Sequence, residues 1–339
     1  MKSDDFKTKR KRRQEHREEE ARLVREFRRR VGSSDNGGLT PQAIHHYRKD
    51  DQIHALIEAG QTEPGMGFIT ALLATCSLPR KDPGDSHQYI RRNGPFCLYL
   101  SRSGEERLPF GILPRLLLAW VCTEVVRTGS PKLYFGPSLA SFMRDLGINS
   151  SDSGGRNGVR TRLREQMHRL FSATLRLTYE SEEEMNTQSL TSPVAVRTNF
   201  WWEPGQFKKV AAWRSTIELG REFFEEIREH PVPIDLNVLR AMKRSSLGVD
   251  IYLWLAYRMN RIYSPVNLPW RQLYRQFAPY PEETAPHLVT NFRRDMLREL
   301  GKIKLAWPGL KYDLKQGKLQ LQPSARRIER RAPAGFSTV

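Results

Sequence analysis

The sequence has few cysteines. Its three, Cys76, Cys97 and Cys122, stand far apart. An odd number at wide spacing provides neither a disulfide framework nor the paired spacing of a zinc site. We therefore expect reduced and mostly buried thiols, as in a cytosolic protein, and no bound metal.

The sequence also lacks a long apolar run. The longest apolar stretch, around residues 112–126, is interrupted by Pro114, Arg115 and Glu124. This pattern predicts a core helix rather than a membrane span. The charged N-terminus has no apolar segment behind it of the kind found in a secretory signal. Together these features predict a cytoplasmic protein with no membrane partner.

Motifs of the common enzyme classes are missing. The Gly-rich stretch GGRNG is followed by Val159 and Arg160, where a nucleotide-binding P-loop has lysine and a hydroxyl residue. No HExxH, GxSxG or His-x-His motif occurs, and acidic residues are scattered rather than clustered as in a polymerase or primase. We therefore expect a protein that is not an enzyme and that needs no cofactor.

Acidic residues are fewer than basic residues. The chain has 38 Asp and Glu against 56 Lys and Arg, a formal net charge of +18. Such an excess favours a polyanionic partner such as nucleic acid. Residues 1–38 are predicted to be a basic N-terminal arm followed by the linker GSSDNGG. Two interpretations of the arm stay open, a solvated tail and an arm that follows a phosphate backbone.

A regular order of elements begins near residue 108. A long apolar helix ends at Gly129, and the helix in SLASFMRDLG begins with Ser138 as N-cap and ends with Gly147 as C-cap. The turn INSSDSGGRNG and the helix VRTRLREQMHRLF follow. The strand LRLTY (175–179) is expected to pair with STIEL (215–219) across a long insertion. Helix, helix, turn, helix and hairpin is the order of a winged helix-turn-helix domain.

The same order then repeats. The stretches GVDIYLWLAYRMNRI, LPWRQLYRQFA and TAPHLVTNFRRDMLREL parallel the three helices of the first unit. A hairpin from IKLAW (303–307) and KLQLQ (318–322) is expected, with Lys311, Lys315 and Gly317 at its tip. The predicted fold class is α+β, mainly α, with two tandem winged helix-turn-helix domains and a basic N-terminal arm.

The predicted elements divide the chain beyond the arm into three parts. Residues 39–219 form the N-terminal winged-helix domain, with a long wing insertion at about 181–213. Residues 220–325 form the C-terminal winged-helix domain, and residues 326–339 form a basic tail.

Each domain has one candidate reading helix. Residues three and four apart lie on one helical face, and apolar residues at that spacing form two matching stripes: Val159, Leu163, Met167 and Leu170, and Val289, Phe292, Met296 and Leu300. The residues opposite these stripes are Asn157, Thr161, Arg164 and His168 in the first helix, and His287, Asn291, Arg294 and Arg298 in the second. Any surface helix has polar residues opposite its buried stripe, but two helices of matching phase favour DNA.

The residue types on these faces suit double-stranded DNA. Arginine pairs with guanine, asparagine with adenine, and threonine contacts a thymine methyl group or a phosphate. Flanking basic residues suit phosphates, which position a protein without reading sequence. These are Arg156, Arg160 and Arg162 in the first domain, and Arg293, Lys302, Lys311, Lys315 and Lys318 in the second.

Several stretches resemble the RepA-type replication initiators of theta-replicating bacterial plasmids over about residues 62–325. They include PSLASFMRDLGI, GGRNGVRTRLREQMHRLF and, most specifically, the segment from PVPIDL to IYLWLAYRM. The resemblance implies a protein that binds direct repeats (iterons) in the double-stranded DNA of the origin. It further implies help in melting adjacent A·T-rich DNA, recruitment of the host initiator and replicative helicase machinery, a homodimeric form and repression of its own gene. The alternative is a winged-helix transcriptional repressor that acts only at a promoter.

Overall fold

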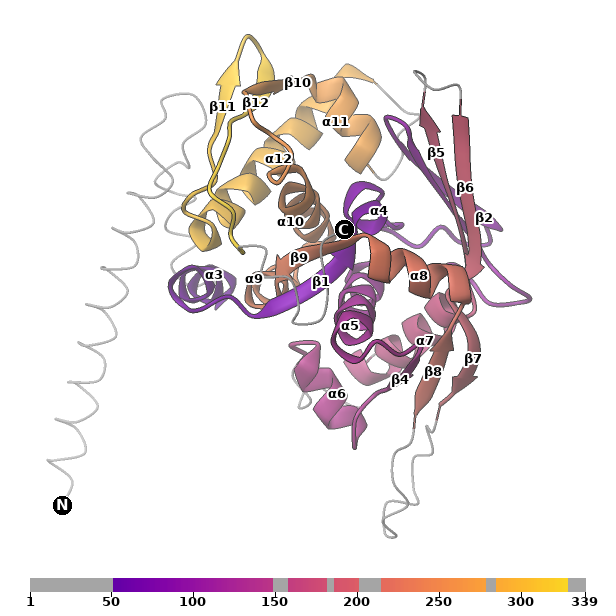
Figure 1. The fold of residues 1–339 in the computed structure, drawn as a ribbon. Helices are drawn as coiled ribbons and strands as arrows, with labels where there is room; N and C mark the ends of the chain where they lie inside the picture. The colour runs from indigo at the N-terminus through magenta and orange to yellow at the C-terminus, as the bar shows by residue number, and fades with distance from the viewer. Residues whose placement is uncertain (1–50, 149–157, 182–185, 201–214, 279–284, 329–339) are drawn as a thin grey trace, which may run out of the picture.

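The structure is a computed structural model that describes residues 51–148, 158–181, 186–200, 215–278 and 285–328 (Figure 1). The predicted arm (1–38) lies outside the described residues, as does most of the predicted tail. Within these residues, helices are interspersed with four small antiparallel sheets. The predicted mixed α and β character is therefore confirmed.

The N-terminal half, up to residue 219, contains five helices among its described residues. These are α3 (Asp51–Gln61), α4 (Ala71–Thr75), α5 (Ile112–Thr128), α6 (Leu139–Asp145) and α7 (Val159–Phe171). Its strands are β1 (Met66–Thr70), β2 (Gln88–Asn93), β3 (Phe96–Ser101), β4 (Lys132–Tyr134), β5 (Thr174–Ser181), β6 (Asn186–Pro193), β7 (Ala195–Asn199) and β8 (Thr216–Leu219).

The C-terminal half, from residue 220, has the same kinds of element in a similar order. Its helices are α8 (Arg221–Glu229), α9 (Leu236–Ala241), α10 (Ser246–Arg258), α11 (Trp270–Phe277) and α12 (Pro286–Ala306). Its strands are β9 (Pro231–Asp235), β10 (Val266–Leu268), β11 (Tyr312–Lys315) and β12 (Lys318–Leu321).

Two units of like topology stand out. In the first unit the order is α5, β4, α6, α7, β7 and β8, with β5 and β6 inserted, and its sheet has the order β4-β8-β7. In the second unit the order is α10, β10, α11, α12, β11 and β12, and its sheet has the order β10-β12-β11. In both sheets the first strand pairs with the last. Helices α5 and α10 lie near the middle of the molecule in Figure 1, with α6 and α7 on one side and α11 and α12 on the other.

The helix ends follow the local sequence signals. Gly129 ends α5 in the left-handed region, and its N–H donates to Val125 O. The Ser138 hydroxyl accepts from the Ser141 N–H at the start of α6. Leu146 is the C-cap of α6 and Gly147 follows with φ 71°, one residue beyond the predicted cap. The N–H of Ile148 reaches back to Met143 O, which completes a Schellman motif.

The predicted apolar stripes of α7 and α12 face the core. Leu163, Met167 and Leu170 are buried, as are Phe292, Met296 and Leu300. Val159 and Val289 at the first turns are half-buried and pack against the same core. The phase of both helices is therefore confirmed.

The predicted pairing of the strand at 175–179 with 215–219 is wrong. Strand β5 pairs with β3 and with β6, whereas β8 pairs with β4 and β7. The polar sequence NTQSLTSP of β6 carries no apolar alternation, so the sequence pattern does not predict a strand there. The inserted element is the β5–β6 hairpin, and the predicted insertion at about 181–213 contains strands β6 and β7.

The predicted strand at 303–307 is also wrong. Helix α12 continues to Ala306, because Ile303 extends the buried stripe three residues beyond Leu300. The hairpin strand lies further on, in β11, and its partner β12 agrees with the predicted 318–322. Gln316 and Gly317 have φ of 50° and 69°, which suits the tight two-residue turn between the strands.

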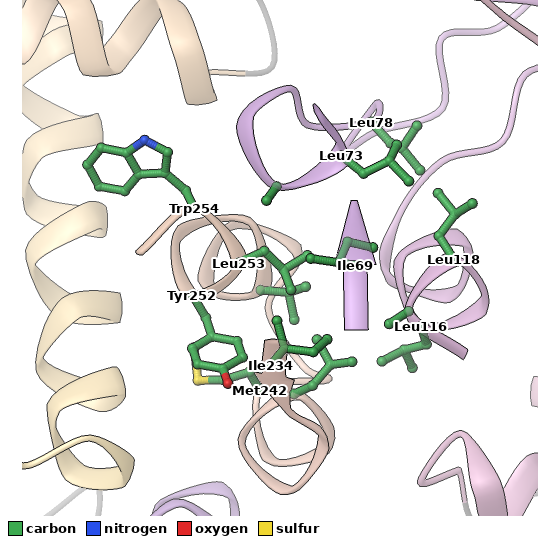
Figure 2. Close-up of a cluster of buried hydrophobic side chains, with 14 of the residues drawn as sticks. Ile69, Leu73, Leu78, Leu116, Leu118, Ile234, Met242, Tyr252, Leu253 and Trp254 are labelled. Carbon is green, nitrogen blue, oxygen red and sulfur yellow. The ribbon is translucent and has the colours of Figure 1, made fainter. Parts of the chain in front are cut away.

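One hydrophobic core extends across both halves of the chain. Strand β1 pairs with β9 along its whole length, from Met66 opposite Asp235 to Thr70 opposite Pro231. Figure 2 shows Ile69 on β1 facing Leu253 on α10 within this core. The predicted domain boundary at residues 219 and 220 stays a prediction, and the two halves are packed together across it.

A buried ion pair joins the central helices. Arg115 on α5 donates from Nε to Asp250 Oδ1 (2.6 Å) and from Nη2 to Asp250 Oδ2 (2.8 Å), and both residues are at most 5% exposed. The remaining guanidinium N–H groups donate to the carbonyls of Leu78, Pro79 and Gly111. All five donors of Arg115 are therefore satisfied.

We expect Arg115→Met to lower the free energy of unfolding by about 3–5 kcal/mol, because it leaves the Asp250 carboxylate buried and unpaired. Arg115→Met/Asp250→Leu should lose less than the sum of the two single changes. Urea unfolding of the four proteins of this cycle gives the coupling energy. The exposed pair of Arg221 and Glu225 on α8 is the control, and Arg221→Met should change little. Additive losses at Arg115 and Asp250 would show that the pair itself is unimportant.

Glu226 on α8 makes stability depend on pH. Burial, with a smaller contribution from Glu229, raises the pKa of this carboxyl from 4.5 to about 7. His230 Nε2 lies 3.9 Å away but its side chain is 57% exposed, so burial prevails. The folded protein therefore binds this proton more tightly than the unfolded chain, and stability falls as pH rises from about 4.5 to about 7.

Glu226→Gln should therefore raise the free energy of unfolding at pH 8 by about 2 kcal/mol and flatten its dependence between pH 5 and 7. Chemical unfolding at pH 5, 6, 7 and 8 measures both effects. Glu222→Gln, on an exposed part of the same helix, is the matched control. An unchanged pH profile would contradict the assignment.

Candidate nucleic-acid interface

The first candidate reading helix, α7, presents basic residues on one side. Arg160, Thr161, Arg162 and Arg164 are exposed, as predicted for a surface that meets DNA. His168 is half-buried, and its ring meets the Phe200 ring edge-on at 5.3 Å. The predicted contacts Arg156 and Asn157 lie outside the described residues.

The opposite side of α7 anchors it to the protein. Arg169 is buried, where Nη1 donates to Leu108 O and lies 3.7 Å from Asp82. The buried Gln166 accepts the Phe110 N–H at 2.9 Å. The helix is thus fixed by its polar residues as well as by its apolar stripe, and the arginines of its other side are left at the surface.

The second candidate reading helix, α12, exposes all four predicted residues: His287, Asn291, Arg294 and Arg298. Asp295, which sequence reasoning did not weigh, lies between the two arginines. Its Oδ1 is 3.9 Å from Arg294 Nε and 3.3 Å from Arg298 Nη2. Because Arg298 also lies 3.6 Å from Glu299, its charge is more strongly compensated. Arg294, with a 73% exposed side chain, is the better placed of the two for a base edge.

Two of the predicted phosphate contacts beside α12 are engaged within the protein. The Arg293 guanidinium lies 5.4 Å from the centre of the Trp270 ring. Lys302 has a 12% exposed side chain, and its ammonium contacts Gln52 Oε1 at 3.3 Å and Glu299 Oε1 at 3.4 Å. The spacing on α12 placed Lys302 at the surface, but packing of α3 against α12 covers it. It joins these helices and is not on the exposed face.

The hairpin after α12 carries positive charge at its tip. Lys315 and Lys318 are opposite each other across the turn, and both are exposed. Lys311, just before β11, is exposed as well. Lysines at the tip of a hairpin reach outward from the protein, where they suit a phosphate backbone rather than a base edge.

The described residues contain no group of three or more His, Cys, Asp or Glu side chains that could hold a metal ion. The three cysteines are free and buried, and burial raises the pKa of Cys76 to about 12 and that of Cys122 further. Across those same parts of the chain, no helix has the length and apolar character needed to cross a membrane.

The middle of the chain is similar to a known protein family. Residues 108–272 match the family model described as plasmid encoded RepA protein. The resemblance to plasmid-encoded RepA replication initiators is confirmed. The matched region begins just before α5 and ends within α11, so it includes α7 but not α12. No curated protein matches the chain.

Two solved structures of RctB domains are similar to the chain. A crystal structure of SeMet derivatives of domain 2 and domain 3 of RctB has 16% sequence identity and a TM-score of 0.48, covering 77% of this chain and 100% of that one. A second crystal structure, of RctB domains 2–3, has 16% identity and a TM-score of 0.45, covering 74% and 94%.

Mutation tests the predicted division between base contacts and phosphate contacts. Arg294→Ala should weaken binding to specific DNA about 10-fold or more, with a smaller effect on scrambled DNA, because a bidentate base contact discriminates by about 1–3 kcal/mol. Lys315→Ala should weaken both about equally and reduce the salt slope by about one. Filter binding or fluorescence anisotropy on both duplexes across a salt series measures this difference. Arg221→Ala, an exposed arginine of α8 paired with Glu225, is the control. Equal losses on both duplexes for Arg294→Ala would remove the reading role of α12.

Proposed function

We propose that the protein is a non-enzymatic plasmid replication initiator that binds direct repeats in double-stranded DNA at its origin. The observation that carries the proposal is the match of residues 108–272 to the RepA family, within which α7 presents an exposed row of arginines. A second exposed basic face, on α12, follows the matched region. Two such faces in one chain suit the recognition of two segments of one duplex.

The two units of like topology support the interpretation as tandem winged helix-turn-helix domains. In each unit a short helix precedes the candidate reading helix, and the strand before that short helix pairs with the last strand of the wing. A winged helix-turn-helix domain places the second helix of the pair in the major groove. Accordingly α7 and α12 are the groove-binding helices, and the β11–β12 hairpin is the wing of the second domain.

Origin melting follows from binding energy in this proposal. Several protomers on adjacent repeats bend the DNA, and the strain falls on A·T-rich DNA beside them. Further unwinding depends on recruited host initiator and helicase proteins. A homodimer that represses the gene completes the scheme, in which the protein works in the bacterial cytoplasm on DNA.

The first test is a binding titration on DNA that flanks the gene, across a salt series, with a scrambled duplex of equal composition as control. An affinity gap that persists at physiological salt, with stepwise complexes that match the number of direct repeats, is the expected result. Binding only to one inverted repeat over a promoter would instead favour a repressor. Equal binding to both duplexes that is lost together as salt rises would contradict the proposal. It would show that the net charge of +18 gives only a general affinity for polyanions.

A further inference from the structure

The end of α6, the helix before α7, is capped by the other half of the chain. The Schellman motif leaves the carbonyls of Asp145 and Gly147 unused within the helix. Arg240 on α9 donates to Asp145 O from Nε (3.2 Å) and Nη2 (2.8 Å), and Lys243 donates from Nζ to Gly147 O. Two cations of the C-terminal half thus bind the negative end of a helix in the N-terminal half.

Gly147 is shaped for this contact. Its φ of 71° is in the left-handed region, and a Cβ at this position would lie 2.6 Å from Arg240 Cγ. A hollow of about 300 Å³ lies beside it, lined by Trp120, Leu146, Leu239 and Arg240 among others. Met143, Leu146 and Ile148 at this end of α6 are buried in the core. The two polar caps add a restraint that comes from the other half of the chain.

The end of α11, the helix before α12, is capped by a residue of the N-terminal half. Arg91 on β2 of the N-terminal half is fully buried and donates from Nη1 to Arg275 O at 3.1 Å. Its Nε donates to the Tyr89 hydroxyl at 2.7 Å, which orients the guanidinium. Gln276 on α11 donates to Thr75 O at 3.3 Å and adds a second link between the halves.

Each capped helix is in turn tied to its reading helix. Phe135 contacts Phe142 of α6 at 4.8 Å and Phe171 of α7 at 5.9 Å, measured between ring centres. Tyr274 of α11 meets Phe292 of α12 at 5.6 Å. A restraint on α6 or α11 is therefore passed to α7 or α12 through aromatic contacts in the core.

We propose that Arg240, Lys243 and Arg91 are positioning residues that hold α7 and α12 at one separation, so that the protein binds two DNA segments at a single spacing. The proposal rests on the proposed function, DNA binding by these two helices. A base pair inserted between the segments moves one of them by about 3.4 Å and rotates it by about 34°. If the separation of α7 and α12 is fixed, one of the two helices then loses its contacts with DNA.

The test uses the full chain and its footprinted site, with one to five base pairs inserted between the two protected segments. Wild-type affinity should fall at least about 10-fold with insertions, the loss of one or more base contacts. Arg240→Gln/Lys243→Gln removes the α6 cap at half-buried positions and so spares the core. This variant should bind DNA of the native spacing more weakly than the wild type does. Inserted base pairs should lower its affinity by less than about 3-fold, because the released helices can follow their DNA segments.

Arg228→Gln/Lys132→Gln removes the same charge at exposed positions and is the matched control. It should keep the wild-type dependence on spacing. If the caps only stabilise the fold, Arg240→Gln/Lys243→Gln should lower the affinity by the same factor at every spacing. That result would overturn the proposal. Wild-type protein that binds its site specifically but tolerates insertions would overturn the proposal while leaving the proposed function intact.

A measurement without DNA separates the two claims completely. Spin labels at Arg162→Cys on α7 and Thr290→Cys on α12 report their separation in the free protein, since the three native cysteines are buried. Wild-type protein should give one narrow distance distribution, and Arg240→Gln/Lys243→Gln a broader one. A broad wild-type distribution, or no change in the variant, would overturn the positioning role even if no specific DNA were bound.

Discussion

The fold depends on the buried ion pair of Arg115 and Asp250. Burying two charges costs several kcal/mol for each ion, and that cost is offset only where every donor finds a partner. Here the carboxylate takes two of the five N–H groups of Arg115, and three backbone carbonyls take the rest. Since α5 and α10 are the first helices of the two units, separating the units would expose an uncompensated charge on each. This constraint holds the first helices of the two units together.

The shared strand pair extends this constraint along the chain. Asp235, at the end of β9, is fully buried; its Oδ1 accepts the N–H groups of Gly65 and Asn237, and its Oδ2 accepts from Arg327. Arg327 also contacts the carbonyls of Ala59 and Thr62. The last described segment is thereby tied to α3 and to the start of β1. A sequence divided at residue 220 thus folds with its early, middle and late segments in contact.

The sequence predicts what local physics determines. The ends of α5 and α6 and the buried stripes of α7 and α12 follow from Gly129, Ser138, Gly147 and helical periodicity, which act over a few residues. The pairing of β5 with β6 could not be predicted, because β6 is polar and its partner is chosen by the sheet. Lys302 has the spacing of a surface residue, yet packing of α3 covers it. The exposed faces of the candidate site were therefore predictable, whereas the partners that neutralise or bury their charges were not.

The inserted hairpin explains why the two units differ. Without β5 and β6, the first unit would have the same strands as the second. The insertion extends the β2–β3 hairpin into a four-stranded sheet, in which β3 pairs with β5 and β5 with β6. That sheet holds β2 against α11, and so brings Arg91 to the Arg275 carbonyl. An element that interrupts the wing of one unit thus supplies the platform that restrains the other unit. The cap on α6 needs no such platform, because α9 follows directly from the shared strand β9.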